Sequence, residues 1–589
     1  MRRVLATAAT LAVCVLASVA PASAGERELW PGVTYEKGVQ FTPNGPVEIS
    51  ILRGPRPDGL TTLEPVLSTE SILGLETLTA MQRRLAPTAT TAGVNGDFFT
   101  LATGRPSGVF MRNGQLVLPP QSSRVSAGIS ADGTLEIRKV GFYGSWQGRD
   151  VKHPLQRLNE APKSGGAALF TEAYGFVTPP VAGATAAVLF PFPAATPDTD
   201  LPAVVSEVLD ASTGVTIPPG GAVLVTLGMS VAKLLAETSQ TESLTVRLGF
   251  LPDWPGIVSA IGGGPRLVEA GVPLYTPGDA FTSIQLEPRH PRTAIGQLAD
   301  GRFVLVAVDG RRPAFSVGLT NFELAQTLVR LGAVTAMAFD GGGSTTMAFD
   351  GTVLNTPSGG VEREIATALV FAYQGVFVPE PVVRVSPNGD GVDDDPVLTV
   401  RVPRPSLVTV RLVGPEGLVA FEETVQRDPG VFPVAFGAVP PPTIDPATGL
   451  AAEAAAPAAA PGAWALEATA VDDLGRTTTM TRTFAVDDTL GFVAVPGEVV
   501  VGKQGARLPF TWQLFRKARM SVTVIDPKGR YVTTLVKGVL APGSYRAVWP
   551  GLRRGKPVAP GRWTIRISAV GPVGRVESLA SVVVRRAAF

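Results

Sequence analysis

The chain has 589 residues, and its 65 glycines and 53 prolines together make up one residue in five. The 51 basic residues are balanced by 50 acidic ones, so the charge pattern argues against a nucleic-acid partner. With two histidines and one cysteine, the chain lacks the residues for a Cys/His zinc site or a disulfide framework. At roughly 100–200 residues per domain, the length predicts three or four domains.

Residues 1–24 have the order of a secretory signal peptide. Arg2-Arg3 give a positive start, a mainly apolar run from Val4 to Val19 follows, and Ala22-Ser23-Ala24 is a small-residue exit. The apolar run is shorter than the ~20 residues that span a bilayer, and its shortness argues against a lipid anchor at Cys14. We expect cleavage after Ala24, no transmembrane segment afterwards, and a secreted, extracytoplasmic protein.

Past Gly25, short β-branched and apolar runs alternate with glycine, proline and turn pairs, which predicts a chain rich in strands. Four turn pairs lie between strand-like runs and predict two-residue hairpin turns. They are Asn113-Gly114, Asp132-Gly133, Asp300-Gly301 and Asp350-Gly351.

One helix is predicted clearly, from about Asn321 to Leu331. Thr320 is its expected N-cap, and Glu323 completes a capping box three residues later. The next run, Val334 to Phe339, predicts a buried strand that ends at Asp340. A strand, a helix and a strand in succession indicate an α+β domain of mostly β composition.

The second part of the chain contains an internal repeat. Residues 461–476 match residues 560–575 at a constant offset of 99, with seven of sixteen positions identical. The Ala/Pro-rich stretch 440–461 predicts a loose loop within the first copy. Two copies of about 100 residues with alternating strands predict two β-sandwich modules, which we interpret as spacers or adhesion modules that could reach a cell surface.

Two clusters of polar residues precede the predicted helix. In Asn95-Gly96-Asp97-Phe98-Phe99, a carboxyl group between a turn and two aromatics could have the raised pKa of a general acid; an ordinary turn is the alternative. In Ile261–Leu267, three glycines allow close backbone approach to a ligand, and the nearby Arg292 could bind an oxyanion in bidentate fashion. Glycine also serves bulges and turns, and His290 is interpreted as a surface or packing residue.

Two further clusters follow predicted strands. The apolar run Val304–Val308 ends in Asp309-Gly310-Arg311, for which a hairpin turn is the alternative. Phe339–Thr346 places a carboxylate, a loop without side chains and three hydroxyls after a buried strand. Such a loop can wrap amide N–H groups around a phosphate, and a plain glycine turn is the alternative. No lysine precedes Ser344, so this segment is not a Walker loop.

With so little histidine, a Ser/His/Asp triad has no supporting motif, which leaves carboxylate and arginine chemistry. Paired carboxyl groups suit glycoside hydrolysis. Arginine and an amide-lined loop suit phosphate. A substrate that contains both a sugar and a phosphate fits all four clusters.

In this order, the clusters resemble the phosphodiester glycosidase family. The resemblance spans about residues 90–372 and implies cleavage of a sugar-1-phosphodiester, such as one of N-acetylglucosamine, with the phosphate left as a monoester. A large segment between the family blocks, about Thr178 to Gly256, has no readable role. The matching motifs are NGDFF at 95–99, PSG at 106–108, GGGPRL at 262–267, PRTAIG at 291–296, VDGR at 308–311 and FDGGGSTTM at 339–347, followed by Asn355–Ser358 and Arg363.

From these motifs we take Asp97, Asp309 and Asp340 as candidate catalytic carboxylates, with the acid and the nucleophile left unassigned. No cofactor is expected for catalysis. The rival hypotheses are a non-catalytic envelope protein that binds polysaccharide or peptidoglycan, and a hydrolase of plain glycosides. The candidate substrate-binding residues are Asn95, Gly263, Arg292, Gly342, Gly343, Ser344, Thr345, Asn355 and Arg363.

The last repeat resembles the Ig-like domain of flagellar hook-capping proteins. The first repeat opens with an acidic segment in which Asn388, Asp390 and Asp393 could hold a calcium ion, although the bidentate glutamate of an EF-hand is missing. A solvated acidic turn is the alternative. The predicted fold class is α+β, with a β-rich catalytic domain at 25–376 followed by two all-β Ig-like sandwich modules at 377–489 and 490–589.

Overall fold

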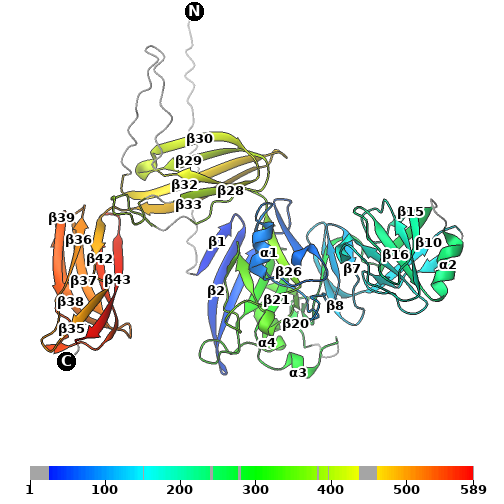
Figure 1. Ribbon diagram of the computed structural model, residues 1–589, viewed down its shortest axis with the longest axis horizontal. Coiled ribbons are helices and arrows are strands. Elements are labelled where there is room, and N and C mark those ends of the chain that lie inside the picture. Colours follow the sequence, from blue (N-terminus) through cyan, green and yellow to red (C-terminus); the bar gives the residue numbers. More distant parts are fainter. Residues whose placement is uncertain are drawn as a thin grey trace, which may run out of the picture. The chain divides into compact units, whose positions relative to one another are not determined.

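The computed structural model describes residues 25–149, 151–238, 243–275, 280–380, 384–394, 397–436 and 460–587 (Figure 1). The chain divides into two compact units, of which the first contains Thr91–Ala372 and the second Tyr373 onward. Strands predominate in both units, which confirms the predicted fold class. The signal sequence lies outside the described residues. Among the helices that the structure describes, none is long and apolar enough to cross a membrane.

The largest sheet of the first unit has the strand order β1-β2-β3-β22-β21-β23-β19-β20. Its central strands are buried along their whole length, and helix α4 (Asn321–Arg330) packs on it through Leu324, Ala325 and Leu328. The bounds are β1 (Glu26–Trp30), β2 (Val33–Thr42), β3 (Gly45–Gly54), β22 (Phe303–Val308), β21 (Arg292–Leu298), β23 (Ala333–Ala338), β19 (Arg266–Glu269) and β20 (Val272–Pro273).

Helix α4 forms where its local signals predict it. The Thr320 hydroxyl accepts the N–H of Glu323 at 3.1 Å, and the Glu323 carboxylate accepts the N–H of Thr320 at 2.9 Å. This reciprocal capping box satisfies two backbone donors that the first turn leaves unpaired. Strand β23 follows at Ala333–Ala338 and leads directly to Asp340, so the predicted helix–strand pair is confirmed within one residue at each end.

Two smaller sheets complete the frame of the first unit. One has the order β25-β24-β5-β26-β4, and the other β7-β6-β18-β8-β9. Helix α1 (Leu78–Leu85) lies between β4 and β5 in the chain. The bounds are β25 (Thr352–Val353), β24 (Met347–Phe349), β5 (Thr90–Asn95), β26 (Thr367–Tyr373), β4 (Thr61–Leu67), β7 (Gln115–Leu118), β6 (Phe110–Arg112), β18 (Ile257–Gly262), β8 (Val125–Ser130) and β9 (Leu135–Lys139).

All four turn pairs lie between paired strands, but only two of them form two-residue turns. In Asn113-Gly114 and Asp350-Gly351, both residues have positive φ (52° and 75°, 47° and 77°), as a type I′ turn requires. Asp132-Gly133 and Asp300-Gly301 lie in four-residue loops, where only the glycine has positive φ. The prediction of a two-residue turn is therefore wrong at these two positions.

An insertion separates β9 from β18, although both strands pair with β8. It contains an eight-stranded sheet, β11-β10-β17-β15-β14-β16-β13-β12, and helix α2 (Met229–Glu237). The unassigned segment Thr178–Gly256 is thus part of this larger insertion, which starts at Gly141. The bounds are β10 (Gly141–Gln147), β11 (Lys152–Pro154), β12 (Arg157–Leu158), β13 (Ala167–Thr171), β14 (Ala184–Leu189), β15 (Asp200–Asp210), β16 (Ala222–Leu227) and β17 (Ser243–Leu251).

The second unit contains two modules built of strands, apart from a single 3-10 turn at Pro415–Gly417 among the described residues, and each has a five-stranded sheet. The strands of the first module are β27 (Arg384–Val385), β28 (Val397–Val402), β29 (Ser406–Val413), β30 (Val419–Arg427), β31 (Gly430–Ala435), β32 (Gly462–Asp472) and β33 (Thr477–Val486). Those of the second are β34 (Leu490–Ala494), β35 (Glu498–Val501), β36 (Leu508–Leu514), β37 (Ala518–Ile525), β38 (Tyr531–Leu540), β39 (Gly543–Trp549), β40 (Leu552–Arg553), β41 (Lys556–Pro557), β42 (Gly561–Val570) and β43 (Arg575–Arg586).

The sequence repeat corresponds to a repeated tryptophan anchor. The indole N–H of Trp464 donates to the carbonyl of Ala460 at 2.8 Å, and that of Trp563 donates to Ala559 at 3.0 Å. Both rings are buried at the start of a long strand, β32 or β42. Such a hydrogen bond satisfies the polar end of a buried indole, and both copies of the repeat place the acceptor four residues before the tryptophan.

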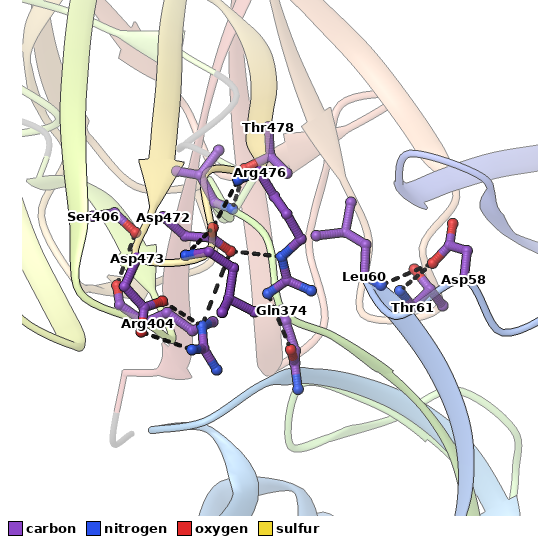
Figure 2. A network of polar contacts seen from close by, with 12 residues as sticks. Asp58, Leu60, Thr61, Gln374, Arg404, Ser406, Asp472, Asp473, Arg476 and Thr478 are labelled. Carbon is purple, nitrogen blue, oxygen red and sulfur yellow. Dashed lines mark hydrogen bonds and ion pairs between the residues drawn. The ribbon is translucent and has the colours of Figure 1, made fainter.

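Figure 2 shows how polar contacts close the turn between β32 and β33. Asp472 accepts the backbone N–H of Arg476 at 2.9 Å and its Nε–H at 2.7 Å, while Arg404 makes two 2.7 Å bonds to Asp473. Within the first unit, the same view shows Asp58 accepting the N–H groups of Leu60 and Thr61. These aspartates stabilise turns, so neither turn is a candidate site.

Candidate functional site

The predicted motifs meet where β5, β21 and β23 end or begin, and Asn95 ties them together. Its Nδ2 donates to the carbonyl of Asp340 at 2.7 Å. Its Oδ1 accepts the Thr293 hydroxyl at 2.7 Å and the N–H of Thr346 at 3.1 Å. Asn95 is 1% exposed, so its amide orders the glycine loop from behind.

A pocket of about 320 Å³ opens at this junction. Five of the six predicted motifs contribute to its wall, which identifies it as the place where the sequence signals converge. Its lining is formed by Phe98, Gly264, Pro265, Phe281, Ile284, Gln285, His290, Arg292, Arg311, Asn321, Ala338, Phe339, Asp340, Gly341, Gly342, Gly343 and Arg363.

Asp340 is the candidate carboxylate that lines this pocket. Burial raises its pKa, while the hydroxyl of Ser344, the charge of Arg363 and the N–H of Gly341 favour the ionised form. The glycine loop after β23 therefore positions the carboxyl group and also supplies the groups that hold its charge.

Asp97 is buried immediately behind the pocket, at 2% exposure. Burial, with a smaller contribution from the charge of Asp340, raises its pKa to about 6 against the opposing effects of Arg124 and the N–H of Gly108. Its Oδ2 accepts the N–H of Gly108 at 2.5 Å, and Arg124 Nη2 lies 3.4 Å from its Oδ1. The two carboxyl groups thus influence each other's ionisation.

Two predicted glycine motifs give the Asp97 carboxyl group its space. A Cβ atom at Gly262 would lie 2.7 Å from Asp97 Cγ and 2.8 Å from Gly108 Cα. A Cβ atom at Gly263 would lie 2.7 Å from the carbonyl oxygen of Ala338. Gly262 is therefore required for the close approach of the Asp97 carboxyl group and Gly108, and Gly263 is required for close packing against the end of β23. The carbonyl of Gly263 also accepts a hydrogen bond from Arg124 at 3.1 Å.

The loop after Asp340 presents bare backbone to the pocket. Gly341, Gly342 and Gly343 line it, and Gly342 has a φ of +65°, which glycine adopts without strain. Ser344 and Thr345 are each 1% exposed and lie behind the loop. The Ser344 hydroxyl donates a hydrogen bond to the Asp340 carboxylate. The Thr345 hydroxyl accepts a hydrogen bond from the Thr293 hydroxyl at 3.3 Å.

Asp309 lies apart from this pair, since it is absent from the pocket lining within the described part of the chain. Its carboxylate accepts Asn355 Nδ2 at 2.9 Å and the N–H of Thr356 at 3.0 Å. Burial raises its pKa, and Asn355 is the strongest group that opposes the rise. The structure therefore places Asp309 and Asn355 where they fix a loop, with both side chains buried.

Arg292 lines the pocket at 8% exposure, but backbone carbonyls occupy its guanidinium group. Its Nε donates to Leu319 at 3.0 Å, and its Nη atoms donate to Gln285 at 3.2 Å and Pro288 at 2.7 Å. Burial and the charge of Arg311 lower its pKa to about 10. Arg292 thus brings positive charge to the pocket and orders the surrounding loops.

An aromatic wall adjoins the carboxyl groups. The rings of Phe98 and Phe281 lie 5.5 Å apart, and the Arg124 guanidinium lies 4.6 Å and 5.2 Å from their centroids. Arg124 also faces Asp97, so a single cation links the aromatic wall to the buried carboxylate.

Sequence reasoning missed five residues of this site: Arg124, Phe281, His290, Arg311 and Asn321. Arg311 belongs to the quoted VDGR motif and could have been selected from it. His290, which we interpreted as a surface or packing residue, is half-buried in the pocket wall. The other three belong to no quoted motif, and only the fold brings them here.

The predicted calcium loop is closed by its own backbone. The carboxylate of Asp394 accepts the N–H groups of Asn388, Gly389 and Gly391, and Asn388 Oδ1 accepts the N–H of Asp390 at 3.0 Å. Among the residues that the structure describes, no group of three or more His, Cys, Asp or Glu could hold a metal ion. Calcium binding by Asn388, Asp390 and Asp393 stays a prediction.

The region that forms the pocket matches a known class of hydrolase domain. Residues 202–372 match the family model described as phosphodiester glycosidase, which confirms the resemblance indicated by the motifs. The match begins inside β15 of the insertion and includes Asp309, Asp340 and Arg363. Asp97 precedes the matched range.

Two curated proteins share short stretches with this chain. The SPbeta prophage-derived uncharacterized protein YomE of Bacillus subtilis (strain 168) is 38% identical over 92 residues, 16% of this chain and 14% of that protein. The N-acetylglucosamine-1-phosphodiester alpha-N-acetylglucosaminidase of Bos taurus is 39% identical over 67 residues, 11% of this chain and 12% of that protein. The chain thus spans less than one sixth of either relative's length.

Among solved structures, the chain is similar to the crystal structure of a hypothetical protein from Synechocystis. The two are 21% identical, with a TM-score of 0.48, and the similarity covers 58% of this chain and 62% of that one.

Proposed function

We propose that the pocket is the active site of a secreted hydrolase that cleaves the glycosidic bond of a sugar-1-phosphodiester, such as one of N-acetylglucosamine, in cell-envelope or extracellular polysaccharide. The observation that carries this proposal is the meeting of an acidic and a basic group of residues in one pocket. The Asp340 carboxyl group and the guanidinium groups of Arg311 and Arg363 lie around the same bare glycine loop.

The leaving group explains why such a pocket needs arginine. Breaking the bond between the anomeric carbon and the phosphate oxygen releases a phosphate monoester, whose second pKa is about 6. Such a group leaves as an anion, so it needs charge stabilisation more than a proton. Arg311 and Arg363, which lie against the glycine loop in the pocket wall, are placed to supply it.

Asp340 then acts at the anomeric carbon, and this role requires an ionised carboxylate. Ser344, Arg363 and the N–H of Gly341 favour that form. If Asp340 attacks the carbon directly, the sugar is released with retained configuration, and if it activates water, the configuration inverts. NMR of the first-formed anomer distinguishes the two routes.

Asp97 and Asp309 have supporting roles in this proposal. The negative charge of Asp340 raises the pKa of Asp97, so ionisation of one carboxyl group disfavours ionisation of the other. Arg124 holds Asp97 beside the aromatic wall. Asp309 fixes the loop at Asn355 and Thr356 through three hydrogen-bond contacts.

The test is release of free sugar and methyl phosphate from the methyl phosphodiester of N-acetylglucosamine-1-phosphate, followed by ³¹P NMR. We expect Asp340→Asn to lower the rate by about a hundred- to ten-thousandfold without lowering the melting temperature. Asp200→Asn makes the same change on a side chain that is 71% exposed and should leave the rate unchanged.

Two outcomes would replace the proposal with a rival. Saturable binding of sugar phosphodiesters without release, across a panel of sugars, indicates a polysaccharide-binding envelope protein. Equal cleavage of the methyl glycoside of N-acetylglucosamine indicates a plain glycosidase, because that substrate has no phosphate for the arginines to bind. The C-terminal modules would hold either protein at a cell surface.

A further inference from the structure

Arg311 occupies an unusual position at the rim of the pocket. Its backbone has a φ of 62°, in the left-handed region that a residue with a side chain adopts only with strain. Its guanidinium lies over the glycine loop, because a Cβ atom at Gly342 would be 3.0 Å from Arg311 Nη2. The Arg311 backbone is therefore strained in the conformation that places its guanidinium beside the loop.

The Arg311 guanidinium is held by one contact on its Nε side. The Nε–H donates to His290 Nδ1 at 3.3 Å. Its two Nη groups have no hydrogen-bond partner among the described residues, whereas carbonyls occupy the donors of Arg292. The free Nη pair is the geometry that binds two oxygens of a phosphoryl group.

Arg363 reaches the same loop at the next glycine. A Cβ atom at Gly343 would lie 2.6 Å from Arg363 Cζ, so this guanidinium also lies against bare backbone. Its Nη1 has one long contact, 3.5 Å to the Ser344 hydroxyl. Arg311 and Arg363 thus lie side by side against the glycine loop, and together they form what we term the phosphoryl clamp.

His290 can accept from Arg311 only while Nδ1 carries no proton. Burial, Arg311 and Arg292 lower the pKa of His290, so the neutral ring persists to lower pH than for a free histidine. The other charged groups near it are the Arg289–Glu323 ion pair and, across the pocket, Asp340. No carboxylate pairs with the imidazole in the described part of the chain.

We propose that His290 is a positioning residue that orients Arg311 in the phosphoryl clamp. The inference rests on the proposed function, since it names the residue that aims one of the phosphate-binding groups of that site. Protonation of Nδ1 removes the acceptor and places two cations in contact, so Arg311 leaves its position and phosphoryl binding weakens.

The test uses titration calorimetry of the full chain with sulfate, whose charge is constant between pH 5.5 and 8. At pH 8, His290→Ala should weaken sulfate binding about tenfold, the loss expected for one misplaced charge-assisted interaction. His290→Asn, which keeps an acceptor near the Nδ1 position, should recover most of the affinity. Between pH 8 and 5.5 the wild type should weaken, and His290→Asn should not.

A double-mutant cycle identifies the route of the effect. Arg311→Ala should weaken binding as much as His290→Ala, and the double variant should add little, because both changes remove one interaction. Arg312→Ala removes a neighbouring exposed arginine and should change nothing. The His290 backbone pairs with Leu319 through main-chain groups, so melting temperatures should stay unchanged.

The failure of this inference differs from the failure of the proposed function. Wild-type affinity in His290→Ala, additive losses in the double variant, no measurable sulfate binding, or stronger wild-type binding at pH 5.5 overturns the role of His290. Sugar release by the wild type together with any of these results leaves the hydrolase in place. The expected sulfate pattern without sugar release retains the clamp and removes the hydrolase.

Discussion

Replacing Asp97 with asparagine removes an ionisable group from a buried position and should stabilise the first unit at neutral pH. The pKa of Asp97 is raised from 3.8 to about 6, because burial outweighs Arg124 and the N–H of Gly108. Below pH 3.8 the carboxyl group is protonated in both the folded and unfolded states and costs nothing. Above pH 6 it is ionised in both states, and the folded state bears the cost.

The size of the effect follows from the shift. About two pKa units at 1.36 kcal/mol each give about 3 kcal/mol of lost unfolding free energy at pH 8. Asparagine resembles the protonated acid and avoids this cost. The first unit has about 340 residues after the signal sequence, so at about 2.1 cal/mol/K per residue the variant should melt about 4 °C higher.

Scanning calorimetry of both proteins at several pH values measures this difference. The gain of Asp97→Asn over the wild type should be near zero at pH 3.5, grow between pH 4 and 6, and stay constant to pH 8. Asp200→Asn, on an exposed side chain, should show no such growth. A difference that does not change with pH, or a variant less stable than the wild type at pH 8, would refute the reasoning.

Two further substitutions test the frame around the site. Gly262→Ala places a Cβ atom 2.7 Å from Asp97 Cγ, so it should lower the free energy of unfolding by about 1–3 kcal/mol and reduce sugar release. Gly38→Ala is the control, because a Cβ atom there meets nothing within 4 Å, and it should change neither quantity. Calorimetry and the sugar-release assay measure the two effects. Thr320→Ala removes the N-cap of α4 and should lower the free energy of unfolding by about 1 kcal/mol, measured by calorimetry. Thr320→Ser keeps the capping hydroxyl and should lower it little. Equal losses in the two variants would contradict the capping argument.

The elements predicted best from the sequence are those whose signals are local. Helix α4 is specified by Thr320, Glu323 and its leucines, all within one short segment. The strand before Asp340 is specified in the same way, by a mainly apolar run that only Thr335 interrupts. The insertion was only partly recognised, because its start at Gly141 depends on which strands pair across the sheet.

The candidate site was predicted in the same uneven way. The glycine loop and Asp340 follow a strand end and were identified from spacing alone. Asp309 and Arg311 are separated by one residue, and a sequence cannot show which of the two reaches the pocket, so Asp309 is predicted in place of Arg311. Arg124 contacts Asp97 although the two residues are 27 positions apart in the sequence, and no short sequence motif includes both of them.

The path of the chain through the sheet β7-β6-β18-β8-β9 affects the order of folding. Strands β9 and β18 flank β8, yet more than a hundred residues separate them, and the chain leaves beside Val125 and returns beside Ser130. Closing so long a loop is entropically costly, and distant pairings form slowly. Because β18 leads directly into Gly262 and Gly263, we expect the pocket to be among the last parts of the first unit to assemble.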